Sequence, residues 1–110
     1  MDKILSLISI AKKSGNVVSG EFSTENAIRD KKAFLVIIAE DASDNTKKKF
    51  KDKSAFYHVP CRLYGDKTGL GRAMGLKERA CLAILDRGLS DAVIAQLNNR
   101  GEIYGENQNI

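Results

Sequence analysis

The chain of 110 residues is poor in proline, cysteine and histidine, has no tryptophan and has no long apolar run. One proline and no low-complexity stretch leave little room for a linker, so we expect one main domain. The longest apolar stretch, residues 33–39, is far shorter than the ~20 residues that a membrane-spanning helix requires. The charged N-terminal segment has no small-residue cleavage site after it and does not resemble a signal peptide. These absences predict a soluble, cytoplasmic protein.

Side chains that bind metals or form disulfides are scarce. Cys61 and Cys81, the only cysteines, each lie in an apolar run and form no C-x-x-C pair, which is typical of reduced core residues in a reducing compartment. His58 is the only histidine and has no second ligand cluster beside it. We therefore expect neither a metal nor a cofactor.

The charge is mildly basic. Eighteen Lys and Arg oppose fourteen Asp and Glu, a formal net charge of +4, which permits a polyanionic partner without requiring one. Lysines gather at positions 47, 48, 49, 51 and 53, where they form either a solvated helix face or a non-specific aid to nucleic-acid binding. Within that segment we expect Asp44 to pair with Lys48 one helical turn later.

Hydrophobic periodicity and capping residues predict that helices and strands alternate along the chain. The run at 34–39 is typical of a central strand buried on both faces. Ser43 is a candidate N-cap, and Leu63 is expected to face inward from its strand. Predicted helices span about 2–14, 21–30, 44–53, a short segment from 66 and a last one ending near 97, and predicted strands span 17–18, 34–39, 57–64 and 80–85. This order indicates an α/β protein, a three-layer α/β/α sandwich around a four-stranded mixed sheet, in one domain over 1–97, with a frayed polar tail at 98–110.

The loop at Gly20 and the helix after it form the first candidate site. Free backbone N–H groups at this helix start suit a phosphate or a base edge, although Gly20 could also serve only a tight turn. At 100° per residue, Phe22, Asn26 and Arg29 share the face opposite to the sheet-facing side of the helix. A ring, an amide and a guanidinium suit base stacking and hydrogen bonding. Alternatively, Phe22 folds back over the strand–helix junction.

Three further segments are ambiguous. Glu40 and Asp41 end a buried strand without a nearby nucleophile or histidine, so we favour orienting and helix-capping roles over acid–base catalysis. The glycine run at 69–75 departs by one residue from a dinucleotide fingerprint and is interpreted as a short helix that approaches the sheet closely and is capped by Gly75. Residues 76–79 form either an ordinary turn or a loop that holds a flipped-out nucleotide.

Together these segments resemble the ribosomal L7Ae/L30e family of kink-turn RNA-binding proteins, especially its small bacterial YlxQ-type members. The resemblance covers residues 3–97 and implies an α/β/α fold that grips tandem sheared G·A pairs with the first loop and helix, and a protruding nucleotide with the loop before the last strand. The stretches that carry it are LSLISIAKKSGNVV at 5–18, Ser19-Gly20-Glu21, FLVIIAEDAS at 34–43, NTKKK at 45–49, Val59-Pro60, LGRA at 70–73 with Gly75, and ACLAIL at 80–85.

Position by position, the resemblance is uneven. Gly20 matches the family glycine, and 76–79 match the second binding loop. Phe22, Ser23 and Asn26 stand where the strongest binders carry asparagine, glutamate and lysine, whereas Ser23 with the threonine after it is closer to the L30e branch.

The sequence thus predicts a non-catalytic protein, a monomer or part of a ribonucleoprotein, that binds kink-turn RNA in or near the ribosome. Two alternatives remain: a protein-interaction module anchored by exposed apolar side chains such as Phe22 and Leu76, and an enzyme that uses Glu40 and Asp41. The expected RNA-binding residues are Gly20, Glu21, Phe22, Ser23, Asn26, Arg29, Lys31, Lys32, Glu40, Leu76, Lys77, Glu78 and Arg79.

Overall fold

Side-chain caps fix where four of the five helices begin. The structure, a computed structural model, describes residues 2–99. Asp2, Ser43, Asp66 and Asp86 each accept a hydrogen bond from a backbone N–H in the first turn of the helix that follows. The elements are α1 (Lys3–Lys13), β1 (Val17–Ser19), α2 (Glu21–Arg29), β2 (Leu35–Ile38), α3 (Asp44–Phe56), β3 (Cys61–Leu63), α4 (Lys67–Ala73), β4 (Cys81–Ile84) and α5 (Arg87–Asn98).

The four strands form one mixed sheet in the order β1-β4-β2-β3. β4 is antiparallel to both of its neighbours, and β2 and β3 are parallel. The three strands β1, β2 and β3 therefore end at one edge of the sheet, which we call the carboxyl edge, and begin at the opposite one, the amino edge. Every residue of β2 and β4 is buried, as predicted for a central strand.

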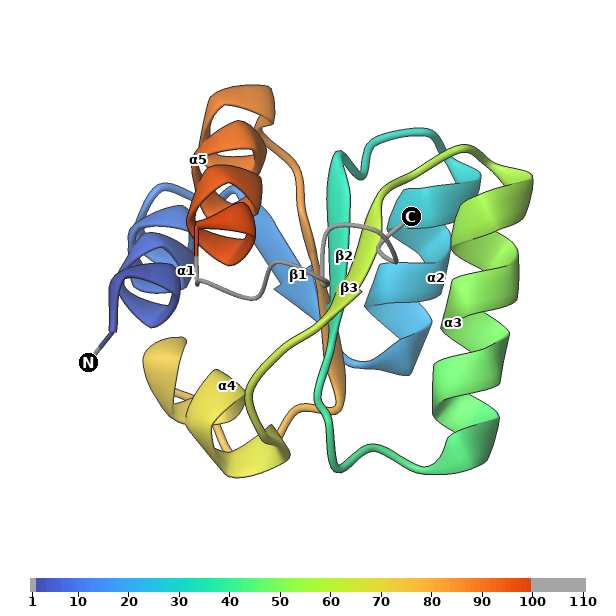
Figure 1. Ribbon diagram of the computed structural model, residues 1–110, viewed down its shortest axis with the longest axis horizontal. Coiled ribbons are helices and arrows are strands. Elements are labelled where there is room, and N and C mark those ends of the chain that lie inside the picture. The colour runs from blue at the N-terminus through green and yellow to red at the C-terminus, as the bar shows by residue number, and fades with distance from the viewer. Residues whose placement is uncertain (1, 100–110) are drawn as a thin grey trace.

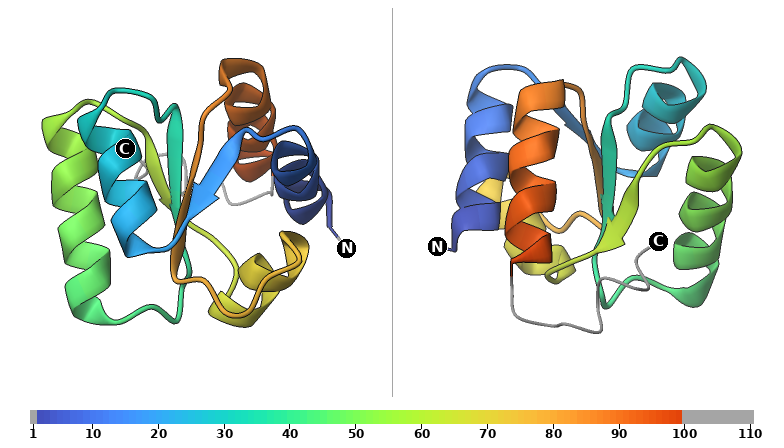
Figure 2. Two further views of the ribbon diagram at one scale, coloured as in Figure 1. Left: turned by 180° about the vertical axis from the view of Figure 1, so that it is seen from behind. Right: turned by 45° about the horizontal axis from the view of Figure 1, so that its top comes forward.

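Helices cover both faces of this sheet, as the predicted three-layer sandwich requires. α2 and α3 lie on one face and α1, α4 and α5 on the other (Figures 1 and 2). Fully buried side chains from both layers fill the core, among them Ile8, Ile28, Phe50, Leu82 and Val93. Within the described residues, no helix combines the length and apolar character needed to cross a membrane.

Two boundary predictions were wrong around the third strand. The helix predicted for 44–53 continues to Phe56, so the strand predicted for 57–64 shrinks to Cys61–Leu63. Leu63 does not face inward but is 44% exposed, because β3 is an edge strand with a short, incompletely covered face. The predicted tail lies outside the described residues, apart from its first two positions.

Both cysteines are free thiols, but they differ in burial. Burial raises the pKa of Cys81 to about 11 and also raises that of the half-buried Cys61. Cys81 is thus the unreactive core residue that its sequence context predicted, whereas Cys61 lies partly at the edge of the sheet.

Ion pairs join α2 to the lysine-rich α3. Lys49 and Lys53 each place the Nζ atom beside a carboxylate oxygen of Glu25, at 3.1 and 3.2 Å. Lys48 pairs with Asp52 at 2.9 Å and not with Asp44, so the predicted direction of that pair was wrong. The lysine cluster is therefore partly neutralised by neighbouring acids.

Candidate nucleic-acid interface

The two predicted binding loops lie side by side at the carboxyl edge, the lower edge in Figure 1. The backbone N–H of Gly20 donates to the carbonyl of Cys81 at 3.0 Å, and that of Ala39 donates to the carbonyl of Ala80 at 2.8 Å. The loop after β2 is tied in turn to the loop after β3. Segments that are about 60 residues apart in the chain thus form one continuous surface.

The start of α2 is shaped for an external partner. Gly20 has φ +86° and ψ 162° and supplies no side-chain cap, so no side chain of that residue occupies the first N–H groups of the helix. Glu21 is already engaged on the neighbouring helix: its carboxylate accepts a hydrogen bond from Thr46 Oγ1 at 2.9 Å and lies 3.6 Å from Lys49 Nζ. Glu21 therefore holds α2 against α3.

Phe22 projects into solvent. Its side chain is 79% exposed, whereas Thr24, Ala27 and Ile28 on the other side of α2 are buried. This confirms the predicted helix face and excludes the alternative in which Phe22 packs over the strand–helix junction. Further along the same helix, the Asn26 amide oxygen accepts a hydrogen bond from the Arg29 guanidinium.

The loop after α4 passes very close to that helix. A Cβ atom on Gly71 would lie 1.9 Å from the carbonyl oxygen of Lys77, so only glycine fits there. The sequence predicted a close backbone approach at this glycine-rich helix. The structure has one, but the helix approaches this loop and not the sheet. Gly75, at φ +72°, turns the chain out of the helix as predicted.

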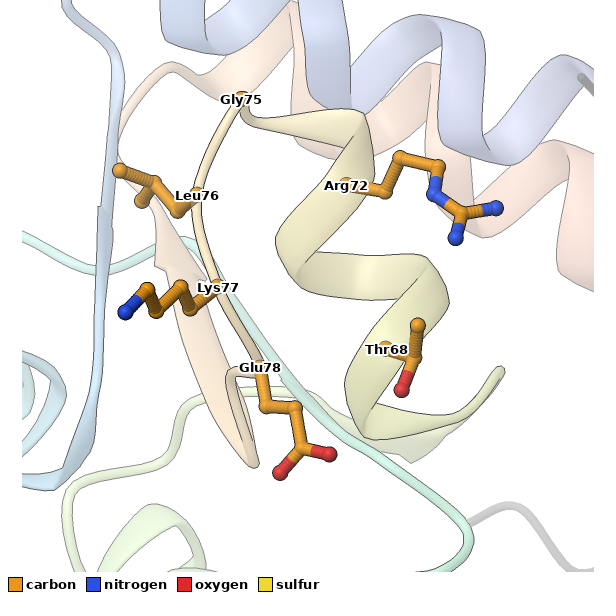
Figure 3. A pocket seen from close by; sticks show the side chains of 6 residues that line it. All are labelled: Thr68, Arg72, Gly75, Leu76, Lys77 and Glu78. Atoms are coloured by element: carbon orange, nitrogen blue, oxygen red, sulfur yellow. The ribbon is translucent and has the colours of Figure 1, made fainter.

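A cavity of about 500 Å³ opens between α4 and this loop, a size within the usual range of ligand sites. In Figure 3, Thr68 and Arg72 extend from α4, while Leu76 and Lys77 extend from the loop on the side away from that helix. The lining therefore combines a hydroxyl, an apolar surface and charged groups. Its lining residues are Thr68, Arg72, Gly75, Leu76, Lys77 and Glu78.

Arg79 connects the two loops. Its Nε donates to Ser19 Oγ at 3.1 Å, its Nη1 donates to the Glu78 carbonyl at 2.8 Å, and its backbone N–H donates to the Lys67 carbonyl at 3.0 Å. The sequence predicted that Arg79 contacts a nucleotide. It gave no indication of the contact with Ser19, because the two residues are far apart in the chain. In the structure, the guanidinium links the two loops, in addition to the backbone hydrogen bond between Gly20 and Cys81.

The two acids after β2 have different surroundings. Asp41 Oδ1 accepts a hydrogen bond from the backbone N–H of Lys67 at 2.9 Å, so it assists Asp66 at the start of α4 and does not cap the next helix in the chain, which Ser43 caps. Glu40 is exposed at the same edge. Across residues 2–99, no group of three or more His, Cys, Asp and Glu side chains is placed to hold a metal ion.

Three predicted residues lie apart from the rest. Arg29 ends α2, and Lys31 and Lys32 follow it, whereas Gly20 precedes the first residue of the same helix. With a rise of about 1.5 Å per residue, that helix separates its two ends by roughly 13 Å. The structure thus brings together the predicted residues of the carboxyl edge and places these three cations at the amino edge.

The chain is thus an α/β/α sandwich with a mixed four-stranded sheet. At one edge, Gly20 precedes α2, and the loop after α4 packs against Gly71. The model of the ribosomal protein L7Ae/L30e/S12e/Gadd45 family matches residues 2–94, and the chain belongs to that family.

Several relatives share most of the chain. It is 41% identical to the RNA-binding protein YlxQ of Enterococcus faecium over 80% of this chain and 84% of that protein. It is 38% identical to the RNA-binding protein YlxQ of Bacillus subtilis over 84% of this chain and 92% of that protein.

Solved structures agree on the fold. A Bacillus halodurans protein of unknown function superposes with a TM-score of 0.87 and 33% identity, over 90% of this chain and all of that one. A 15.5 kD RNA-binding protein of Giardia lamblia superposes with a TM-score of 0.72 over 88% of this chain and 86% of that one. At 23% identity, the second match supports the fold alone.

Proposed function

We propose that the chain is a non-catalytic, cytoplasmic RNA-binding protein that recognises kink-turn RNA at its carboxyl edge and acts in or near the ribosome. The family and the YlxQ relatives support RNA as the ligand. The observation that carries the proposal is the exposed ring of Phe22, which stands beside an uncapped helix start on the same edge as the 74–79 loop.

The first loop and α2 would read the bases. The Phe22 ring stacks on an unpaired base, a contact that every base can make through its π-face. The Gly20 turn keeps side chains away from the helix start, so base edges or a phosphate can approach the N–H groups there. The Asn26 amide both donates and accepts, and its contact with Arg29 orients it along the exposed face of α2.

The second loop would hold the nucleotide that a sharp bend pushes out of the helix. Leu76, which is partly buried against the core, leaves part of an apolar side chain at this surface, and Lys77 adds an exposed cation, both on the side of the loop away from α4 (Figure 3). Bases displaced from RNA helices are bound in this manner, by apolar contact on a face and polar contact at an edge. Because Arg79 fixes the distance to the first loop, the two contacts would select one bend of the RNA.

The charge of this edge favours base recognition over simple attraction to phosphates. The loops at 19–23, 39–44, 64–68 and 74–79 contain six carboxylates and three cations. Carboxylates repel a phosphate backbone but accept hydrogen bonds from the amino groups of bases. Glu40 and Glu78, both exposed, are placed for that role. The energy must therefore come from stacking and shape, which requires an RNA that is already bent or bends easily.

Titration of a kink-turn RNA against a duplex of equal length tests the proposal. We expect clearly tighter binding to the kink-turn, with the preference maintained as salt is raised, because base contacts are less sensitive to salt than phosphate contacts. Equal affinities would refute kink-turn recognition. A partner that remains bound in pull-down after nuclease treatment, combined with no RNA preference, would support the protein-interaction module instead.

A further inference from the structure

The loops at the amino edge, opposite to the proposed kink-turn site, form a second continuous surface. Backbone hydrogen bonds hold them together through the strands: Leu85 N–H donates to the Asn16 carbonyl at 2.8 Å, Phe34 N–H donates to the carbonyl of Ile84 in β4 at 2.8 Å, and Val36 N–H in β2 donates to the Pro60 carbonyl at 2.9 Å. The segments are 12–16 after α1, 29–34 after α2, 57–60 after α3 and 85–87 before α5, all at the upper edge in Figure 1 and again in Figure 2.

Positive charge gathers here with fewer acidic partners than on α3. Residues 47–53 of α3 have an equal local surplus, but Lys48 pairs there with Asp52, and Lys49 and Lys53 pair with Glu25. The amino-edge segments hold two carboxylates, and their surplus of four positive charges equals the formal net charge of the whole chain. Both carboxylates are engaged, since Asp86 caps α5 through the Leu89 N–H and Asp30 lies 3.8 Å from Arg29 Nε. The six cations, all exposed, are Lys12, Lys13, Arg29, Lys31, Lys32 and Arg87.

Helix dipoles explain only some of these cations. Lys12, Lys13 and Arg29 lie in the last turns of their helices, where a positive charge is favourable. Lys31 and Lys32 lie beyond the end of α2. Arg87 is the first residue of α5, where the dipole disfavours a cation. Stabilisation of helix ends therefore does not explain Lys31, Lys32 and Arg87, which are half of the six cations.

An exposed aromatic ring lies within the cluster. Phe34 is 39% exposed, and the Arg87 guanidinium lies over its ring with Cζ 5.6 Å from the ring centroid. A ring and a guanidinium that are stacked and open to solvent among lysines are the groups that contact both the bases and the phosphates of nucleic acids. An acidic surface of a partner protein would pair with the cations but would offer no base or ribose to contact the Phe34 ring.

We propose that the amino edge is a second RNA-binding surface, which holds the sugar–phosphate backbone of an RNA helix without regard to sequence. The molecule measures 31 × 31 × 26 Å, so the opposite edges of its sheet contact different segments of RNA. Backbone contact by lysines supplies affinity and orientation, and the Arg87–Phe34 pair provides a flat surface for an exposed base or ribose. This surface acts on RNA that need not contain a kink-turn.

Binding of a plain RNA duplex, measured over a salt series, tests this surface. The variant Lys13→Gln/Lys31→Gln/Lys32→Gln removes three exposed cations of the amino edge. Because each phosphate contact contributes roughly 0.9 to the slope of log affinity against log salt, we expect the slope to fall by about two to three. Phe34→Leu, which keeps apolar bulk but removes the ring, should weaken binding of a duplex with a single-stranded overhang more than binding of a blunt one.

The matched control is Lys47→Gln/Lys48→Gln/Lys51→Gln, which removes the same charge from α3. We expect it to keep most of the wild-type slope, and thermal unfolding should show that both triple variants are folded. Equal loss of slope in the two variants would overturn the proposal, since the binding would then depend on net charge alone. Displacement of the duplex by polyglutamate or anionic phospholipid vesicles as readily as by unlabelled duplex would also overturn it.

The duplex assay separates this inference from the kink-turn proposal. Phe22→Ala should leave duplex binding unchanged, because Phe22 lies at the other edge. If the kink-turn preference is absent but the amino-edge variant still loses its slope, only the proposed function fails. If the preference is present and the slope is unaffected by the amino-edge variant, only the second surface fails.

Discussion

The two edges of one sheet differ in chemistry. The carboxyl edge has six carboxylates against three cations and three glycines with positive φ, whereas the amino edge has six cations against two carboxylates. Net charge therefore permits a polyanionic partner but does not locate the site that would recognise it. Specific recognition and general attraction can occupy separate surfaces of a domain this small.

Helix direction accounts for part of this contrast. α2 and α3 begin at the carboxyl edge and end at the amino edge, so capping oxygens and acids gather at the first and lysines and arginines at the second. The exceptions identify function better than the rule does. Phe22 near the start of α2 and Arg87 at the start of α5 have no role in stabilising a helix end.

The largest effect is expected from Gly71→Ala. The new Cβ would meet the Lys77 carbonyl at 1.9 Å, and this backbone clash outweighs the ~1 kcal/mol that alanine gains over glycine in a helix. We expect a loss of about 1–3 kcal/mol in unfolding free energy. Kink-turn affinity should also fall, whereas duplex binding at the amino edge stays. Thermal unfolding and the two titrations measure this.

Gly69→Ala is the control for this prediction. It makes the same change in the same helix, but its Cβ would meet the capping carboxylate of Asp66 at 3.0 Å and not a backbone atom, so only a small shift of that side chain is needed. If the two substitutions lower the unfolding free energy and the kink-turn affinity equally, the close approach at Gly71 does not position the second loop.

The next effect is that of Phe22→Ala on kink-turn binding. Loss of one stacked base costs about 1–3 kcal/mol, and the fold should be unaffected because the ring is exposed. Isothermal titration gives the difference. Phe56→Ala, at a ring that is 73% exposed near the amino edge, is the matched control. If both variants bind the kink-turn equally well, Phe22 is not part of the site.

A smaller effect should follow from Ser19→Ala. It removes the acceptor for Arg79 Nε, a part-buried hydrogen bond of the kind that contributes about 0.5–1.5 kcal/mol. Looser spacing of the two loops should weaken kink-turn binding severalfold. Arg79→Lys keeps the charge but loses the fork geometry, so it should behave like Ser19→Ala. Full affinity in Arg79→Lys would mean that charge, and not spacing, matters.

The smallest effect concerns the ion pairs of Glu25 with Lys49 and Lys53, which join α2 to α3. Lys49 and Lys53 lower the pKa of Glu25 below its usual 4.5. Because this pKa is lower in the folded state, the pairs stabilise the protein at neutral pH, and that stabilisation is lost as pH falls from about 4.5 through the folded-state pKa.

Glu25→Gln should therefore lower the unfolding free energy at neutral pH by no more than about 1 kcal/mol, the range for exposed pairs. The difference from wild type should disappear in acid, and binding at both edges should persist. Unfolding curves across pH test this, with Asp52→Asn as the control that removes an ion pair within α3. A difference that persists in acid would rule out the ion pairs as its cause.

Much of the fold could be predicted from local signals. The buried run at 34–39, the cap Ser43, the helix that starts after Asp66 and the periodicity of the helices depend on neighbouring residues alone. The length of the third strand, which ends at Leu63, was overestimated. Alternation shows that residues can face inward, but not that another layer covers them. A lysine-rich segment with one buried phenylalanine likewise gave no clear end for α3.

The candidate site could be predicted only in part. The helix face that exposes Phe22 follows from helical geometry, and the structure confirms it. The contact of Arg79 with Ser19, the use of Glu21 by α3 and the placing of Lys31 and Lys32 at the far edge all depend on the tertiary arrangement. None of these has a local signature in the chain.

Amide chemical shifts of the isotope-labelled protein, recorded with a minimal kink-turn RNA, test the central claim most directly. We predict the largest changes at Gly20, at Phe22 and along 75–79, with smaller changes at the amino-edge loops at 12–16 and 29–34, which would contact only the helical arms of the RNA. Changes confined to those amino-edge loops, with Gly20 and 75–79 unaffected, would contradict recognition at the carboxyl edge.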